Sequence, residues 1–76
     1  MSKNWTSDEL SNLETKVASL ESLKASDPTG WWTARDGRAR AISMRANLTQ
    51  QPPDNLVADA LVQRHKSVVD RLAGII

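Results

Sequence analysis

Apolar residues in the first third of the chain recur at the spacing of a helix face. Four of them, separated by alternating steps of three and four positions, fall on one side of a helix. They are Leu10, Leu13, Val17 and Leu20. Just upstream, Thr6 and Glu9 have the spacing of a capping box, in which each side chain bonds the backbone of the other residue. We therefore predict a helix over about residues 7–25.

The last third of the chain has one broad apolar face. At about 100° per residue, eight apolar residues share this side of a helix. They are Val57, Ala58, Leu61, Val68, Val69, Leu72, Ile75 and Ile76. Asp54 is placed to cap the start of this helix, and Gly74 stands where a glycine commonly ends one. The pattern predicts a helix over about residues 55–73.

The middle segment, residues 31–50, has apolar residues on two sides. One strip consists of Ala34, Ala41, Met44 and Leu48, and the other of Ala39, Ile42, Ala46 and two tryptophans. Turns that contain proline separate this segment from both neighbours. We expect one helix over about residues 31–50, with Gly37 disturbing its first turn. Because it is apolar on two sides, this helix needs more than one packing partner.

These patterns predict an all-α protein, with a single helical domain over residues 1–76 and a flexible N-terminal arm over residues 1–5. Three antiparallel helices form either a compact bundle or a helical hairpin that a second copy completes. A chain of 76 residues has a small core and, without cysteine, no disulfide to support it. We therefore expect a homo-oligomer, either a dimer or a larger assembly. Its predicted interface residues are Ala41, Met44, Leu48 and His65.

Size and composition argue against catalysis and against metal or cofactor binding. A preorganised active site needs more supporting scaffold than this chain offers, so we do not expect an enzyme. With no cysteine and a single histidine, no metal site of the usual ligand types can be assembled, and no cofactor is expected. The chain also lacks the run of about 20 apolar residues that spans a bilayer. We therefore expect no membrane association and a cytoplasmic location.

Charge is divided unevenly along the chain, although the net charge is only +1. Residues 1–30 sum to −2 (three lysines, five acids), residues 31–50 to +3 (four arginines, one acid) and residues 51–76 to zero (three of each sign). Arginine presents a planar set of donors that matches phosphate, and tryptophan offers a face on which a base stacks. The middle segment combines both types, which predicts a ligand-binding site. Its residues are Trp31, Trp32, Arg35, Arg38 and Arg45.

Two functions follow from these patterns. In the first, a non-enzymatic oligomeric binding protein captures a phosphate-bearing ligand through this cluster: a nucleotide, a cyclic oligonucleotide or single-stranded nucleic acid. In the second, the chain is an interaction module (a small inhibitor, adaptor or chaperone) that docks on a protein partner through the apolar faces of residues 31–50. A purely structural alternative for the cluster is that the tryptophans close the end of the bundle while the arginines pair with Glu14, Glu21 or Asp59.

The entry to the last helix carries one resemblance. Pro53, Asp54 and Asn55, followed by an alanine- and valine-rich helix, resemble the final helix of small phage proteins that sequester cyclic oligonucleotides. The resemblance covers about a third of the chain and contains no diagnostic motif, so it identifies no family. The size and helical pattern are equally typical of phage head-completion proteins and secretion chaperones.

Overall fold

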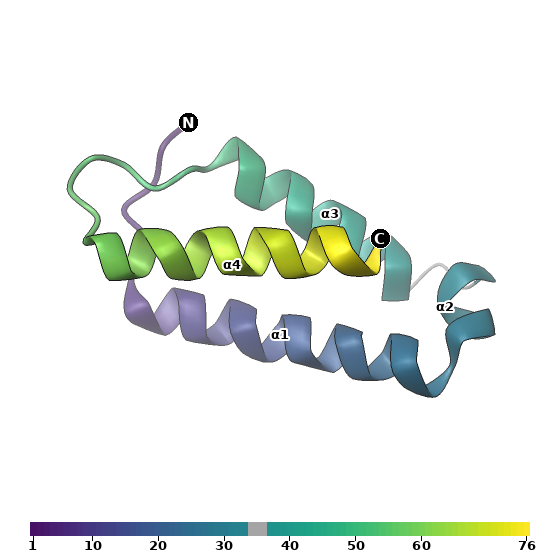
Figure 1. The fold of residues 1–76 in the computed structure, drawn as a ribbon. Helices are drawn as coiled ribbons and strands as arrows, with labels where there is room; N and C mark the ends of the chain where they lie inside the picture. The colour runs from purple at the N-terminus through teal and green to yellow at the C-terminus, as the bar shows by residue number, and fades with distance from the viewer. Residues whose placement is uncertain (34–36) are drawn as a thin grey trace.

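The computed structural model describes residues 1–33 and 37–76. Within this part the chain forms four helices, which are α1 (Ser7–Ser26), α2 (Pro28–Thr33), α3 (Gly37–Gln50) and α4 (Asp59–Ile75). The only strand-like contact among the described residues is an isolated bridge between Lys3 and Pro53. The prediction of an all-α protein is confirmed, with α1, α3 and α4 as its three long helices (Figure 1).

The first helix begins where the sequence predicts it. The Thr6 side chain accepts a hydrogen bond from the Glu9 backbone, and the Glu9 carboxylate accepts one from the Thr6 backbone, so the capping box is present. Trp5 and Leu10, which flank the box, are both buried in the core. α1 then continues to Ser26, one residue beyond its predicted end.

The prediction of a single helix over residues 31–50, and with it the count of three helices, is wrong for the described chain. Asp27 ends α1, with its backbone N–H bonded to the Leu23 carbonyl at 3.0 Å. Its carboxylate then accepts a hydrogen bond from the Gly30 backbone at 3.0 Å, and α2 starts at Pro28. Asp27 is therefore the C-cap of α1 and lies immediately before the first residue of α2. The two tryptophans belong to this short second helix.

The last helix begins four residues later than predicted. The Asp54 carboxylate accepts a hydrogen bond from the Leu56 backbone at 2.9 Å, and its carbonyl accepts one from the Val57 backbone at 3.2 Å. These bonds close a turn ahead of the helix instead of capping it. The N-cap position is Ala58, which has an extended backbone and provides no side-chain cap.

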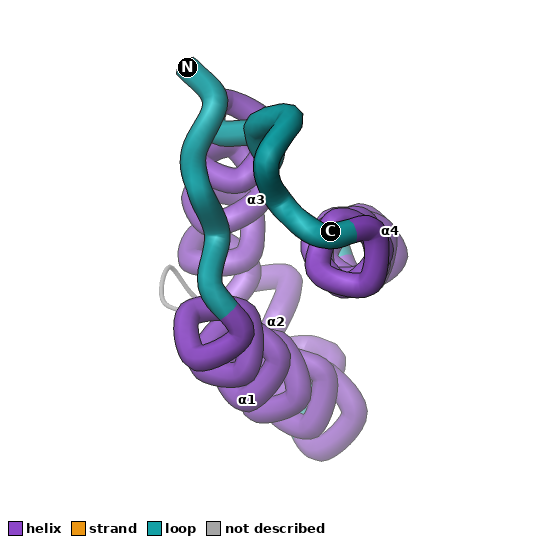
Figure 2. The backbone as a smooth tube through the Cα atoms, turned by 90° about the vertical axis from the view of Figure 1, so that its left-hand side faces the viewer, coloured by secondary structure: helices purple, strands orange, loops and turns teal. Residues whose placement is uncertain are grey.

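Helix α4 contacts both of the other long helices. It packs against both α1 and α3, which also contact each other (Figures 1 and 2). α1 and α4 run in the same direction, and α3 runs against them. The buried apolar cluster in the described part of the chain contains Trp5, Leu10, Val17, Leu20, Trp31, Ala41, Leu48, Val68, Leu72 and Ile75.

Two ion pairs on the surface join α4 to α1. Arg64 contacts Glu14 at 2.6 Å and also donates to two serine hydroxyls of α1, and Arg71 pairs with Glu21 further along the same helices. Hydrogen bonds from the two arginines hold the pKa of both glutamates below its usual value. Because these side chains are partly exposed, the pairs contribute little stability and serve mainly to fix the register of the two helices.

The first five residues lie along the loop that joins α3 to α4. Lys3 donates its backbone N–H to the Pro52 carbonyl at 2.9 Å and accepts a hydrogen bond from the Asp54 backbone at 3.1 Å. Trp5 is 7% exposed and donates its indole N–H to the Gln51 carbonyl at 2.7 Å. The segment that the sequence suggests as a flexible arm is therefore tied to a loop far from it in sequence.

The glycines at positions 37 and 74 give a matched pair of stability predictions. A Cβ added at Gly37 would lie 2.8 Å from the nearest ring atom of Trp31, whereas a Cβ at Gly74 meets nothing within 4 Å. Gly37→Ala is therefore expected to lower the free energy of unfolding by about 1–3 kcal/mol. Gly74→Ala, inside α4, should raise it by about 0.5 kcal/mol. Urea denaturation followed by circular dichroism measures both changes, and a stabilised Gly37→Ala variant would contradict the close approach of the ring.

Candidate functional site

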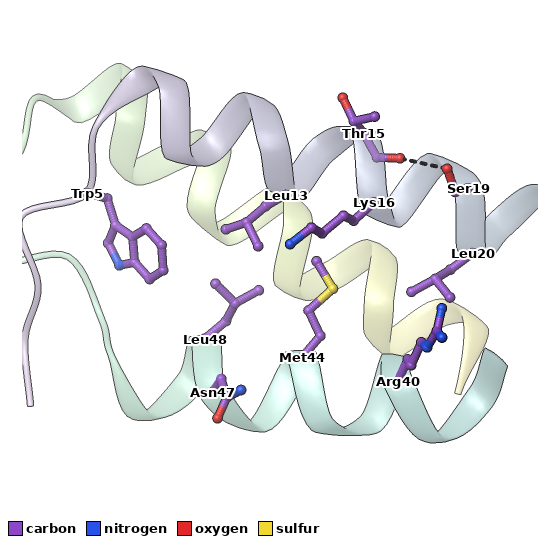
Figure 3. Close-up of a pocket in the computed structure, with 10 residues that line it drawn as sticks. All are labelled: Trp5, Leu13, Thr15, Lys16, Ser19, Leu20, Arg40, Met44, Asn47 and Leu48. Carbon is purple, nitrogen blue, oxygen red and sulfur yellow. Dashed lines mark hydrogen bonds between the residues drawn. The ribbon is translucent and has the colours of Figure 1, made fainter. Parts of the chain in front are cut away.

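A groove of about 570 Å³ lies between α1 and α3 (Figure 3). Its apolar lining consists of Leu13 and Leu20 from α1, Met44 and Leu48 from α3, and Trp5 at one end. Among the described residues, none from α4 lines it, so the groove is the side of the α1–α3 pair that α4 leaves uncovered. Its volume and apolar lining are typical of ligand-binding sites.

The polar groups of the groove are cationic or neutral. Lys16 from α1 and Arg40 from α3 line it, and no carboxylate does so in the described part of the chain. The Thr15 hydroxyl donates to the Ser11 carbonyl at 3.0 Å and the Ser19 hydroxyl to the Thr15 carbonyl at 3.2 Å, so both donors are satisfied within α1. The groups left to bond an occupant are therefore the Lys16 ammonium, the Arg40 guanidinium and the Asn47 amide.

The apolar residues that line the groove differ in how deeply they are buried. Leu20 and Leu48 are 8% and 2% exposed and belong to the core beneath it. Leu13 and Met44 pack against this core but remain only partly buried. The bottom of the groove is therefore part of the packed core, and its edges are apolar side chains that remain in contact with water.

The predicted interface residues are divided between the core and the groove. Ala41 is fully buried and His65 is 6% exposed, so a partner cannot reach either of them in this structure. Leu48 is almost fully buried but contributes to the groove floor, and Met44 lies half-buried in the groove. Of the four residues, Met44 and the accessible edge of Leu48 are the ones that an incoming side chain can contact.

The structure also places the residues of the predicted ligand-binding cluster in different surroundings. Trp31 is 1% exposed and donates its indole N–H to the Ile75 carbonyl at 2.9 Å, so its ring is unavailable for stacking. Trp32 is 54% exposed, and the Arg38 guanidinium lies 5.0 Å from its ring centroid. Arg45 instead borders a separate hollow of about 250 Å³.

The described arginines of the middle segment do not pair with the acidic side chains that the sequence offers. Glu14 and Glu21 pair with arginines of α4, and Asp59 forms no ion pair within the described chain. None of the arginines of α3 forms one either: Arg38, Arg40 and Arg45. Arg35 and Ala34 lie outside the described residues. α3 therefore presents positive charge that these acids do not compensate.

The sequence patterns do not single out three cations that the structure places at these sites. Lys16 and Arg40 line the groove, and the Lys24 ammonium lies 5.2 Å from the Trp32 ring centroid. Lys16 stands three residues after Leu13, so at helical spacing it borders the apolar face of α1. A cation at the edge of an apolar stripe is the signal that indicates such a residue, although it is also common on ordinary surface helices.

His65 lies in the core beside Trp5. Their ring centroids are 5.4 Å apart with the planes tilted by 49°, and the Nε2 atom of His65 has no hydrogen-bond partner in the described structure. Burial lowers the pKa of this imidazole below its usual value, against the opposing effect of the Leu48 and Gln51 backbone. The side chain is therefore neutral at pH 7 and acts as part of the core.

Other indications of function are absent from the described part of the chain. No group of three histidine or acidic side chains there could hold a metal ion. No described helix is long and apolar enough to cross a membrane. Comparisons with protein-family models, with curated proteins and with solved structures find no match to this chain. The function is therefore inferred from the groove and the exposed cations.

Proposed function

We propose that this protein is a non-enzymatic interaction module, and that the groove between α1 and α3 receives an acidic amphipathic helix of a partner protein. The observation that supports the proposal is an apolar floor combined with two cations and no carboxylate among the described lining residues. The proposal corresponds to the second function inferred from the sequence, with the docking surface moved from the faces of one helix to the groove between two.

The apolar lining of the groove favours a helix as its occupant. Leu13 and Met44 are partly exposed in the isolated chain, so covering them removes apolar surface from water. A helix laid along the groove presents apolar side chains at every third or fourth position, as in other helix-in-groove complexes. Met44 can adapt its side chain to different partners because methionine is unbranched and flexible. The docked helix also completes a four-helix arrangement on the side that α4 leaves uncovered.

The two cations determine the sign of charge that the groove accepts. An occupant whose apolar stripe is flanked by glutamate or aspartate can pair with Lys16 and Arg40, whereas one flanked by lysine is repelled. α3 adds to this preference, because the segment Gly37–Gln50 contains three arginines and no acidic residue. Charge complementarity therefore supports an acidic helix as the occupant.

A second copy of this chain is a poorer occupant than an acidic partner. Pairing groove to groove brings four cations together, and neither described lining supplies a carboxylate. Three glutamates of α1 are unavailable to compensate because each forms an ion pair within its own chain. These are Glu9, Glu14 and Glu21. The homo-oligomer expected from the sequence is thus the competing outcome of the test.

Two synthetic peptides test the proposal. Both are helices of about 18 residues, or ~27 Å, with leucines at i, i+3, i+4 and i+7, and the leucines are flanked by glutamate in one and lysine in the other. We expect the glutamate peptide to bind the full chain at least about tenfold more tightly, a difference of about 1.4 kcal/mol. The reason is that lysines beside the groove meet like charges. Isothermal titration calorimetry measures both dissociation constants.

Charge-reversal variants provide the control. Lys16→Glu combined with Arg40→Glu should invert the preference, and both side chains are exposed, so the fold is expected to persist. Arg45→Glu combined with Lys66→Glu makes the same charge change at exposed positions outside the groove and should leave the preference unchanged. The proposal is wrong if both double variants behave alike, or if light scattering shows a dimer that excludes both peptides.

A further inference from the structure

A second cluster, where α1, α2 and α3 meet, is built around an exposed tryptophan. Trp32 of α2 is 54% exposed. Lys24, near the end of α1, lies 5.2 Å from its ring centroid, and Arg38, near the start of α3, lies 5.0 Å from it. Three helices thus bring one aromatic side chain and two cations together, and we call these residues the Trp32 cluster.

Trp32 differs from the other two tryptophans in both burial and bonding. Trp5 and Trp31 are 7% and 1% exposed, and their indole N–H groups donate to backbone carbonyls. The Trp32 indole N–H makes no hydrogen bond within the described chain. An aromatic side chain that keeps much of its apolar surface and its donor in water is typical of a binding surface.

Neither cation of the cluster pairs with an aspartate or glutamate side chain of the described residues. The Arg38 Nε atom donates to the backbone oxygen of Ile76 at 3.2 Å, and both cations lie over the tryptophan ring. The nearby Asp27 carboxylate accepts a hydrogen bond from the Gly30 backbone, and Glu21 pairs with an arginine of α4. The cluster therefore combines two positive charges with an aromatic face, and it shares no residue with the groove lining.

We infer that the Trp32 cluster binds a nucleoside phosphate. The base stacks on the Trp32 indole in place of a cation that lies over the ring in the unbound chain, and the indole accepts any base because every base has a π face. The phosphate is bound by the Lys24 ammonium and the Arg38 guanidinium, whose planar donors match its oxygens. An anionic membrane surface fits less well, since one indole offers far less apolar area than the helix face that membrane binding needs.

The indole N–H resonances of the full chain test this inference. Titration with AMP should shift the Trp32 resonance and leave those of the two buried tryptophans unchanged. Adenosine alone and inorganic phosphate alone should each bind at least about tenfold more weakly than AMP, because each makes only half of the contacts. Added salt should weaken AMP binding, since the phosphate contact is ionic.

Variants test the phosphate contact and the stacking contact, and they distinguish loss of binding from loss of structure. Lys24→Gln combined with Arg38→Gln should weaken AMP binding at least about tenfold, while Arg45→Gln combined with Lys66→Gln, the matched control at exposed positions outside the cluster and the groove, should leave it unchanged. The Arg38 Nε atom also donates to the backbone oxygen of Ile76 at 3.2 Å, so the first double variant can lose structure. Trp32→Leu removes the stacking face without touching that bond, and it should abolish the difference between AMP and inorganic phosphate.

A free nucleotide and a nucleic-acid strand share this chemistry, so AMP is compared with a thymidine strand of about eight nucleotides. Tighter binding of AMP assigns the site to free nucleotides, and tighter binding of the strand assigns it to single-stranded nucleic acid. Both results support the inference. It is overturned if AMP leaves the Trp32 resonance unshifted up to about 10 mM, if inorganic phosphate binds as tightly as AMP, or if Trp32→Leu binds AMP normally.

Discussion

Replacing Trp31 with alanine is expected to lower the free energy of unfolding by about 3–5 kcal/mol, which is a large part of the ~5–15 kcal/mol typical of a native domain. The side chain is 1% exposed, its ring lies against Gly37, and its indole N–H donates to the Ile75 carbonyl at 2.9 Å. The substitution therefore opens a cavity beside α3 and leaves a buried carbonyl of α4 without its partner. We expect the variant to unfold at a urea concentration at which the unmodified chain is still native.

The adjacent tryptophan is the control for this prediction. Trp32 is 54% exposed, so Trp32→Ala should change the free energy of unfolding by no more than about 0.5–1 kcal/mol. Urea denaturation followed by circular dichroism measures both variants. Because the two residues are of the same type and adjacent in sequence, their difference reports the burial of the Trp31 ring together with its hydrogen bond to Ile75. Equal effects would falsify the placement of Trp31 in the core.

Acidification is expected to weaken the fold in two stages, of which the first belongs to His65. Burial keeps the pKa of this imidazole in the folded chain below 6.5, so the unfolded chain takes up a proton first as the pH falls. The stability contributed by the neutral ring is present in full above pH 6.5. It is then lost as the pH falls from 6.5 through the lower folded-state pKa.

The second stage belongs to the carboxylates of α1. Hydrogen bonds from basic side chains hold the pKa of three glutamates below 4.5 in the folded chain. They are Glu9, Glu14 and Glu21. Their contribution is present above pH 4.5 and is lost as the pH falls below that value, because the unfolded chain is protonated first. Both stages therefore act in the same direction, and the second is expected to be small because the three ion pairs are partly exposed.

The variant His65→Gln separates the two stages. Its side chain does not titrate, so the urea midpoint should be flat from pH 6.5 down to the onset of the glutamate stage, although the variant is less stable throughout because the buried ring is lost. Urea midpoints measured across the pH range follow both proteins. A midpoint that is constant between pH 6.5 and 4.5 in the unmodified chain, or a first stage that persists in His65→Gln, would contradict the assignment.

Elements defined by short-range patterns could be predicted from the sequence, and those that depend on packing could not. The capping box of Thr6 and Glu9 needs only two residues three positions apart, so the start of α1 is visible in the sequence. Asp54 offers the same carboxylate to a helix cap or to a turn, and nothing local decides between them. The close approach of Gly37 to the ring of Trp31 is a contact that no periodicity indicates.

The candidate site, too, could be predicted only in part from the sequence. Met44 and Leu48 belong to an apolar strip with helical spacing, and this strip does line the groove. The sequence does not show which of two adjacent tryptophans is buried, because the position of α2 against the end of α4 decides it. Nor does it show that Glu14 pairs with α4, since the order of helices around the core determines which arginines lie within reach.

The two buried indoles close opposite ends of the bundle, each through a hydrogen bond to a residue more than 40 positions away, Trp5 to Gln51 and Trp31 to Ile75. Each is therefore an optical reporter of its own end, since water reaching an indole changes its fluorescence. With Trp32→Phe removing the exposed emitter, a further Trp5→Phe or Trp31→Phe replacement keeps a ring in the core and leaves one indole to report on its own end. Coincident melting curves mean that the bundle opens as one cooperative unit, and separated curves mean that one end frays before the other.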